Sequence, residues 1–392
     1  MTLGAPNIAV ETPIHVPHAT DALGVVGEAA EERISVATQR QLMWWRFRKH
    51  RLALVATAIV LAFYAAVILA GFLAYADPEA SDAQRGLIAP QPIYWFDDTG
   101  FHPYVLGLTG RRDPRTFKRV YVTDETRHVP LTLFVQGFPY RLFGLVPTDR
   151  HLLGVDGASA EESLFLLGTD LEGRDVWSRL MYGTQTSLTI GLMSVLLSLV
   201  LGVVLGGISG FYGGLLDTVI QRVIEILRSV PTIPLWMGLA AAMPRDWDIY
   251  RVYFAITVII SLIGWTELAR VVRGRFLSLR EEDFVTAAEL AGCGQPRIIF
   301  VHMVPLFLSH IIAATTLALP AMVISETSLS FLGLGLRPPA ISWGVLLQEA
   351  QNVQTLAISP WLLLPAIPVI VVILAFNFLG DGLRDAADPY GV

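Results

Sequence analysis

The scarcity and spacing of lysine residues limit the phosphoryl chemistry that this sequence can carry out. The chain has two lysines, Lys49 and Lys118, which are followed by His50 and Arg119. A phosphate-binding loop needs Gly-Lys-Ser/Thr, in which the lysine reaches the β- and γ-phosphates of a nucleotide. The sequence therefore lacks that ATPase site, and the HExxH and GxSxG patterns of zinc proteases and serine hydrolases are also absent.

The single cysteine, Cys293, cannot form an intrachain disulfide or a cysteine-based metal cluster. We interpret it as a small apolar residue and expect no metal and no cofactor bound by this chain. The formal net charge is −6, and no long basic block occurs. Since nucleic-acid binders need a basic footprint, we expect no nucleic-acid partner.

Composition predicts an all-α polytopic membrane protein. Hydrophobic residues make up 53% of the chain, and charged residues only 16%, against roughly 25% in soluble domains. Six spans are predicted: residues 52–76, one span within the charge-free stretch 180–216, and residues 219–243, 252–270, 304–327 and 361–381. Pro231 and Pro234 are expected to kink the third of them, 219–243.

Basic residues set the expected orientation. Arginines and a lysine precede the first span with no acid among them, and more arginines lie between the fourth and fifth spans. By the positive-inside rule, both termini are expected in the cytoplasm of a bacterium and the chain in its inner membrane, with lipid around it. The residues concerned are Arg40, Arg46, Arg48, Lys49 and Arg51, and then Arg270, Arg273, Arg275, Arg280 and Arg297.

The long insert after the first span has strand-like stretches, such as RVYVTD and LTLFVQG. It is interpreted either as a passive extracytoplasmic elaboration or as a small domain that contacts a delivery partner. The expected organisation is a disordered tail (1–38), an interfacial segment with the first span (39–76), the insert with some β character (77–181), a five-helix transmembrane domain (182–384) and a cytoplasmic C-terminus (385–392).

Gly202, Gly206 and Gly210 recur at four-residue spacing inside the second span. Small residues at that spacing share one helix face and let two backbones approach closely. The three glycines predict a packing seam, either within the subunit or against a partner.

Glu326 is predicted at the outer end of the fifth span. Ionisable residues at membrane depth usually face protein or water, so Glu326 is a candidate for the translocation path. It can equally be an interfacial carboxylate that caps a short helix.

The segment TAAELAGCGQPRIIFVHMVP (286–305) predicts a cytoplasmic helical hairpin within the coupling loop 271–304. Acids 281–283 favour a helix start, Gly292 and Gly294 can end that helix, and Pro296 suits the start of the next one. Ala287, Ala288 and Ala291 give the first helix a smooth surface. That surface can seat in a groove of another protein or pack on its own second helix.

This segment resembles the loop of ABC importer permeases, which has the form Glu-Ala-Ala, three residues, Gly, nine residues, Ile-x-Leu-Pro. Ala287, Ala288, Gly292 and Pro305 stand in matching positions, whereas Thr286 replaces the first glutamate. His302 and Val304 also depart from the pattern, by replacing its isoleucine and leucine.

The subgroup that the chain most resembles is the second permease subunit of the dipeptide/oligopeptide/nickel class. Four more stretches are similar to it, in the same order, and the resemblance covers about 167–390 plus the first span. The stretches are LGTDLEGRDVWSRLMYGTQTSL (167–188), GFYGGLLD (210–217), SLSFLGLGLRPPAISWG (328–344) and AFNFLGDGLRDAADP (375–389).

The resemblance implies an ATP-driven importer of di- or oligopeptides or related small solutes. It implies a second, similar permease, two ABC ATPase subunits that hold ATP and Mg, and an extracytoplasmic binding protein. The first helix of the hairpin would then be a coupling helix seated in an ATPase cleft. The coupling residues implied are Asp283, Phe284, Thr286, Ala287, Ala288, Glu289, Gly292 and Pro305.

Two other functional classes fit the sequence less well. A secondary transporter or channel would place acids or histidines inside several spans, and the interiors of the first, second and sixth spans have none. Glu267 and Arg270 in the fourth span are three residues apart and can pair with each other. A membrane enzyme would need a catalytic constellation, which the sequence does not show.

Overall fold

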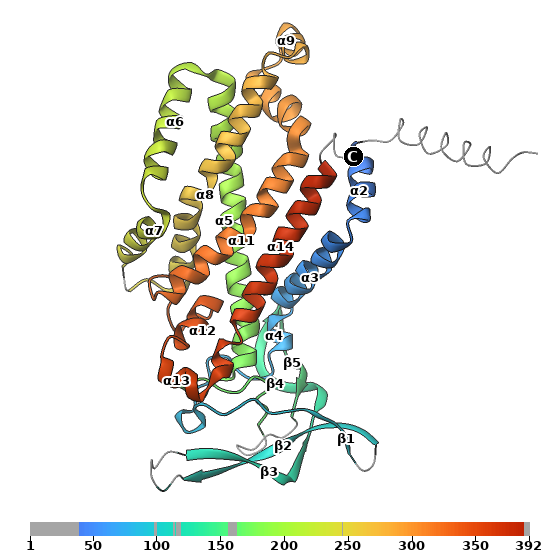
Figure 1. The fold of residues 1–392 in the computed structure, drawn as a ribbon, viewed down its shortest axis with the longest axis vertical. Coiled ribbons are helices and arrows are strands. Elements are labelled where there is room, and N and C mark those ends of the chain that lie inside the picture. The colour runs from blue at the N-terminus through green and yellow to red at the C-terminus, as the bar shows by residue number, and fades with distance from the viewer. Residues whose placement is uncertain are drawn as a thin grey trace, which may run out of the picture.

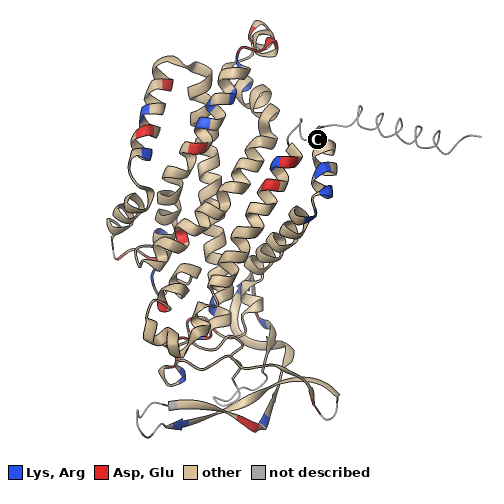
Figure 2. Ribbon diagram, viewed as in Figure 1, with Lys and Arg blue, Asp and Glu red and all other residues tan. Residues whose placement is uncertain are grey.

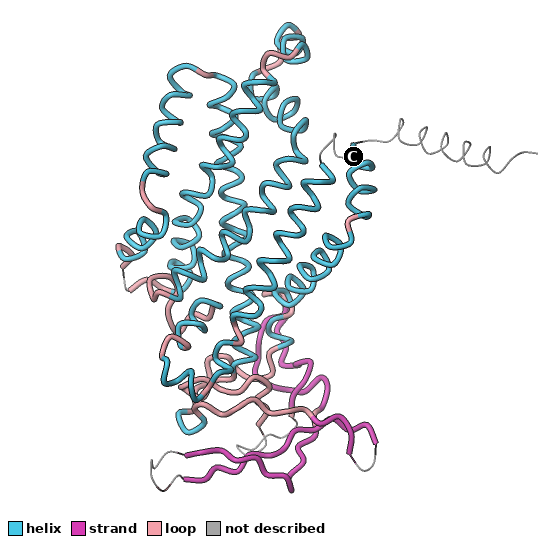
Figure 3. Tube along the Cα trace, viewed as in Figure 1, coloured by secondary structure: helices cyan, strands magenta, loops and turns pink. Residues whose placement is uncertain are grey.

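The computed structural model describes residues 39–97, 100–112, 114, 119–155, 163–244 and 246–387. The predicted tail (1–38) and residues 388–392 of the predicted C-terminal segment lie outside the described residues. Helices form an elongated bundle, and the strands gather at one end of it (Figures 1 and 3). Figure 2 shows charged residues mainly toward the two ends of the bundle, as expected for a body that crosses lipid.

Five helical stretches of the described residues are long and apolar enough to cross a membrane. The bundle helix α5 begins at Val176, inside the range expected for the insert, and α14 runs on to Ala387. The long helices of the bundle are α3 (Arg51–Ile68), α5 (Val176–Tyr212), α8 (Ile249–Leu279), α11 (Leu308–Phe331) and α14 (Ala366–Ala387).

The third predicted span is broken rather than kinked. It forms α6 (Gly214–Ser229) and α7 (Thr232–Ala241), which meet at 88°, so the described chain has six spans only if this bent pair counts as one. The break lies at Pro231, and Val230 before it is extended, as a residue preceding proline prefers to be. Pro234 lies in the first turn of α7, where its missing N–H leaves no helical bond unmade.

The N-terminal described region is a helix that ends at a capped junction. α2 (Gln39–Lys49) meets α3 at His50, whose Nδ1 accepts the backbone N–H of Ala53 at 3.1 Å. The first predicted span, 52–76, is shorter as a single helix, because α3 stops at Ile68 and a short α4 (Ala70–Leu73) follows.

The insert forms two small antiparallel sheets, which confirms its β character. β1 (Tyr94–Asp97), β2 (Gly100–Arg112) and β3 (Arg119–Pro130) pair in that order, and β4 (Thr132–Leu142) pairs with β5 (Val146–Gly154). A short 3-10 turn, η1 (Ala83–Arg85), precedes them.

Buried His151 of β5 ties the second sheet to the bundle. Its ring nitrogens lie 2.9 Å from the carbonyl oxygen of Gly71 in α4 and 3.0 Å from that of Phe138 in β4. The second sheet of the insert therefore packs against the end of the first span through a direct hydrogen bond.

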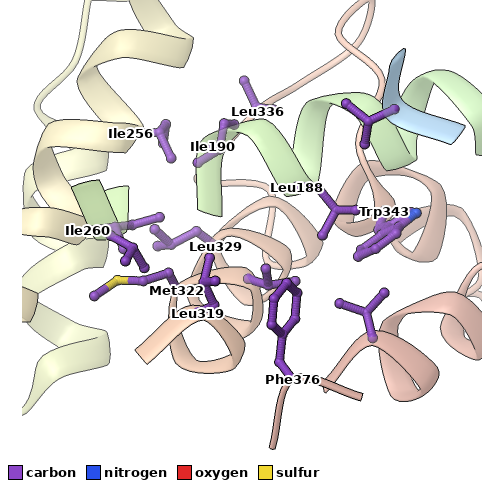
Figure 4. Close-up of a cluster of buried hydrophobic side chains, with 14 of the residues drawn as sticks. Leu188, Ile190, Ile256, Ile260, Leu319, Met322, Leu329, Leu336, Trp343 and Phe376 are labelled. Carbon is purple, nitrogen blue, oxygen red and sulfur yellow. The ribbon is translucent and has the colours of Figure 1, made fainter. Parts of the chain in front are cut away.

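The main core lies between α3, α5, α8, α11 and α14 and is closed at the sheet end by α12 (Trp343–Glu349). Figure 4 shows Trp343 beside Leu188, with Phe376 close by. Phe63 of α3 meets the Trp343 ring edge-on, with centroids 6.3 Å apart, a geometry that aromatic quadrupoles favour. α13 (Val353–Ile358) and η4 (Pro360–Leu363) complete the chain before α14.

Gly202, Gly206 and Gly210 all face α8 of the same chain. A Cβ at position 202 would lie 2.9 Å from Cβ of Leu268, and one at 206 would lie 2.9 Å from Cβ of Val272. At 210 it would lie 2.7 Å from the carbonyl oxygen of Arg273. Since real Cβ atoms do not come this close, only glycine lets α5 and α8 pack at this distance.

We predict that Gly206→Val destabilises the protein, because the added side chain meets the α8 backbone and overpacking costs about 1–3 kcal/mol. Thermal unfolding of the detergent-purified chain should shift down by several degrees. Gly274→Val is the matched control, since nothing lies within 4 Å of a Cβ at that position. Equal unfolding temperatures for the two variants would contradict the seam.

Candidate functional site: the α9 hairpin

The predicted cytoplasmic hairpin is a two-turn helix, α9 (Asp283–Leu290), that stands beyond one end of the bundle (Figure 1). Gly292 ends it with φ +78°, a left-handed conformation that suits glycine. The N–H groups of Gly292 and Cys293 donate to the carbonyl oxygens of Glu289 (2.9 Å) and Ala288 (3.0 Å), a Schellman pattern. Gly294 is extended and caps the next helix instead.

The return arm of the hairpin runs into α11 without a long break. α10 (Gln295–Arg297) is followed by a π-helical turn, η2 (Ile298–Met303), and a 3-10 turn, η3 (Val304–Phe307). Pro305 lacks an N–H and therefore cannot continue an α-helical ladder, which accounts for the irregular turns on either side of it. The arm links α9 mechanically to the fifth predicted span.

One face of α9 is fixed to the bundle by a buried apolar cluster. Val285 of α9 packs with Phe276 of α8 and with Ile298 and Met303 of η2, all of them buried. Phe276 in turn meets Phe307 edge-on, with ring centroids 5.7 Å apart. Burial of such side chains contributes about 1.5–3 kcal/mol each, so this cluster stabilises the attachment of α9 to α8 and η2.

The other face of α9 is open. Ala288 packs partly on the hairpin's own cluster, as Phe284 does, whereas Ala287 and Ala291 are exposed. Seating of the exposed alanines in another protein stays a prediction. Thr286 and Glu289 are both exposed, and either can contact a partner. The remaining implied coupling residues, Asp283, Gly292 and Pro305, are exposed as well.

Leu290 was not among the residues predicted for this site, yet its side chain is 85% exposed at the end of α9. A large apolar side chain at the tip of a protruding helix is suited to insertion into a partner's pocket. In the sequence, Glu289, Leu290 and Ala291 directly precede the helix-ending glycine. That position places Leu290 at the end of the first helix of the hairpin.

An ion pair fixes the α6–α8 contact at the same end of the bundle. Arg273 donates to both carboxylate oxygens of Asp217, from Nε at 2.6 Å and from Nη2 at 2.7 Å. Glu267 pairs with Arg228 of α6. The predicted pair of Glu267 with Arg270 is therefore wrong, because α6 supplies a cation that local helix spacing cannot reveal.

The described residues contain no group of three or more histidine, cysteine, aspartate and glutamate side chains arranged to hold a metal ion. The hairpin presents a protruding helix with one exposed face.

Comparison with known proteins decides the family. Residues 202–390 match the binding-protein-dependent transport system inner membrane component, and residues 38–90 match the N-terminal TM domain of oligopeptide transport permease C. The oligopeptide transport system permease protein OppC of Escherichia coli (strain K12) is 41% identical over 242 residues, which cover 62% of this chain and 78% of that protein. The chain belongs to this family of transport permeases.

A second OppC relative agrees. OppC of Salmonella typhimurium is 44% identical over 223 residues, 57% of this chain and 71% of that protein. A solved chain of the MetNI methionine ABC transporter aligns over 52% of this chain and 95% of that chain, with a TM-score of 0.39 and 18% identity. The resemblance to ABC importer permeases is confirmed, and this permease is a multi-pass inner membrane protein.

Glu326 of the permease lies at the end of the bundle opposite α9 and is completely buried. It accepts hydrogen bonds from Ser187 of α5 and Ser330 of α11, both at 2.8 Å. Ser187 also accepts the backbone N–H of Trp343 at 3.1 Å. Glu326 thus faces the interior of the subunit and links α5, α11 and, through Ser187, the start of α12. The side chain that caps α12 is Ser342, so a capping role for Glu326 in that helix is not seen, and its role in a translocation path stays a prediction.

A second buried network of four charges joins the segment before α5 to α12. Arg174 donates to Asp170 at 2.7 Å and to Glu349 at 2.9 Å, and Arg179 donates to Glu349 at 2.8 Å and also to Asp170. The two arginines offset these two acids, as buried charges require, and Arg174 also pairs with the exposed Glu172 at 2.9 Å. The sequence analysis grouped three of these residues in one stretch, but only folding brings Glu349 to them.

Asp175, next to this network, caps α5. Its carboxylate accepts the Ser178 backbone N–H and the Tyr75 hydroxyl, each at 2.7 Å. Burial raises the pKa of Asp175 to about 6, although the hydrogen bonds from Tyr75 and Ser178 oppose that shift. The first span and the second are therefore joined through a carboxyl that titrates near neutrality.

We predict that Asp175 makes the permease less stable as pH rises from about 4 to about 6. In that window the unfolded chain releases the proton that the folded chain keeps, so the free energy of unfolding falls, by up to about 3 kcal/mol. Thermal unfolding in detergent should lose this slope in Asp175→Asn, since an asparagine can still accept the Ser178 N–H. An unchanged slope in Asp175→Asn would assign the pH dependence to other groups.

Proposed function

We propose that this permease is a transmembrane subunit of an ATP-driven importer that moves di- or oligopeptides, or related small solutes, into the cytoplasm. The observation that carries the proposal is α9, a short helix fixed by one face and open on the other at the end of a membrane bundle. Family membership supports it, and the names of the OppC relatives support peptides as the solute.

The energy would come from partners. The sequence has no phosphate-binding lysine motif, so ATP and Mg would be held by two ABC ATPase subunits. A second, similar permease would complete the pathway, and an extracytoplasmic binding protein would deliver the solute. The chain itself would contribute no catalytic residue and no cofactor.

Closure of the ATPases would reach the spans through packed side chains. A displacement of α9 acts on Val285, which bears on Phe276 of α8. Phe276 lies against Gly210 of α5, so α8 and α5 would move as one body. The return arm would carry the same displacement to α11. Close-packed interiors transmit such shifts because they are not easily compressed.

The proposed orientation places α9 and both termini in the cytoplasm and the strands outside. Arginines and lysines of α2 and of the end of α8 lie toward the α9 end of the bundle (Figure 2). The positive-inside rule assigns that end to the cytoplasm.

We predict that Ala287→Arg abolishes coupling without unfolding the permease. Ala287 is exposed on α9, so a long charged side chain costs the fold little but blocks a close-fitting cleft. Peptide uptake by proteoliposomes that hold the complete transporter and its binding protein should fall at least about tenfold.

Thr218→Arg is the matched control, since Thr218 is exposed near the start of α6, which Figure 1 places at the same end of the bundle. Normal uptake by Ala287→Arg would refute the coupling role of α9. Uptake that persists when the ATPase subunits are left out would instead favour a secondary transporter.

The β1–β2 hairpin gives the insert a proposed role as a docking surface for the binding protein. Trp95, Phe96 and Phe101 are 54%, 70% and 62% exposed, and the Phe101 ring stacks on Trp95 and meets Phe96 edge-on. Exposed aromatic rings in a group are characteristic of interfaces. Their place at the end of the molecule opposite α9 fits a partner that arrives from outside.

We predict that Phe96→Ser with Phe101→Ser weakens stimulation of ATP hydrolysis by the loaded binding protein at least about threefold, because aromatic anchors carry much of an interface's energy. ATPase activity of the reconstituted transporter, titrated with binding protein, measures this. Val122→Ser on β3 is the control, being half exposed and away from the hairpin tip. Identical titration curves would leave the insert as a passive elaboration.

A further inference from the structure

A cavity of about 490 Å³ opens at the α9 end of the bundle, between the end of α8, the start of α11 and the end of α14. Arg275, His310 and Arg384 line it, one from each of these helices. The proposed coupling route does not use any of the three. The two arginines outnumber the one acid on the cavity wall, Asp385, so the cavity has a positive potential.

The two arginines have no acidic partner among the residues that the structure describes. Asp385, the acid on the cavity wall, lies 3.9 Å from Nε2 of His50 and not against either arginine. Arg275 and Arg384 are exposed, so their guanidinium groups are free to bind an anion from outside the chain. Guanidinium groups pair with phosphate oxygens through two parallel hydrogen bonds.

An apolar groove of about 410 Å³ adjoins the cavity, and Ser309 lines both. Met43, Trp44 and Phe47 of α2 form one side of the groove, and Leu308, Ile312 and Leu383 form the other. A basic cavity beside an apolar groove matches an amphiphile with an anionic head and a hydrocarbon tail.

The expected depth of the site in the bilayer also suits an amphiphile with an anionic head. Trp44 and Trp45 of α2 are exposed, and tryptophans concentrate at the boundary between lipid and water. The basic residues Arg48 and Lys49 follow within the same helix. Because the groove beside α2 adjoins the cavity, a lipid head at the level of these tryptophans and basic residues would be near Arg275 and Arg384.

We propose that this paired cavity and groove bind one anionic phospholipid. Its phosphate contacts Arg275 and Arg384, and an acyl chain lies in the groove between α2, α11 and α14. The lipid then fills the space beside Leu306 and Phe307, through which the return arm of the α9 hairpin enters α11. A zwitterionic lipid would bring its own cation to the arginines and bind less well.

The test uses the complete transporter, with all its subunits, in detergent, and native mass spectrometry of retained lipid. Phosphatidylglycerol and phosphatidylcholine with identical acyl chains are added in turn. We expect phosphatidylglycerol to be retained, and Arg275→Gln with Arg384→Gln to lower its retention at least about fivefold. Arg222→Gln is the control, since Arg222 is exposed but pairs with Glu225.

A second variant tests the groove separately. Ile312→Trp fills the groove while leaving both arginines in place, and we expect it also to lower phosphatidylglycerol retention. Equal retention of the two lipids, or retention unaffected by Arg275→Gln with Arg384→Gln, would overturn the proposal. Displacement of the lipid by millimolar inorganic phosphate would reduce the site to one for a free anion. Loss of a protein subunit from the double variant, with lipid retention unchanged, would assign the cavity to a protein contact.

Discussion

The close approach of α5 and α8 is the constraint on which the rest of this permease depends. At Gly210 the two helices come so near that Phe276 of α8 lies against the α5 backbone. The same Phe276 packs with Val285, the buried residue of α9. A wider spacing would remove the support beneath α9 and would also separate Asp217 from Arg273. The placement of the α9 hairpin is therefore set inside the bundle, by three glycine positions that lack a side chain.

Much of this arrangement could be predicted from the sequence, because the signals are local. The hairpin follows from Gly292 and Pro296, whose backbone preferences hold in any context. The glycine spacing in the second span indicates a seam, but its partner could be identified only once α8 was placed in space.

Other features are long-range and left no local signal. The 88° break at Pro231 exceeds what a kink would give, and proline alone does not fix the angle. Glu267 has a suitable cation three residues away and pairs with Arg228 instead. Glu349 joins Arg179 across 170 residues of sequence. Contacts of this kind depend on how helices pack, which hydrophobic periodicity does not specify.

The buried charges at the sheet end have a consequence for the solution that this end of the permease meets. On the proposed outer side, ionic strength follows the surroundings of the cell and is not held constant. Exposed ion pairs weaken as dissolved salt rises, since the Debye length shrinks from about 10 Å at 0.1 M to about 3 Å at 1 M. Arg179 is only 1% exposed, so water and salt have little access to its links with Asp170 and Glu349. The ionic contact between the segment before α5 and α12 would therefore persist at low and at high ionic strength.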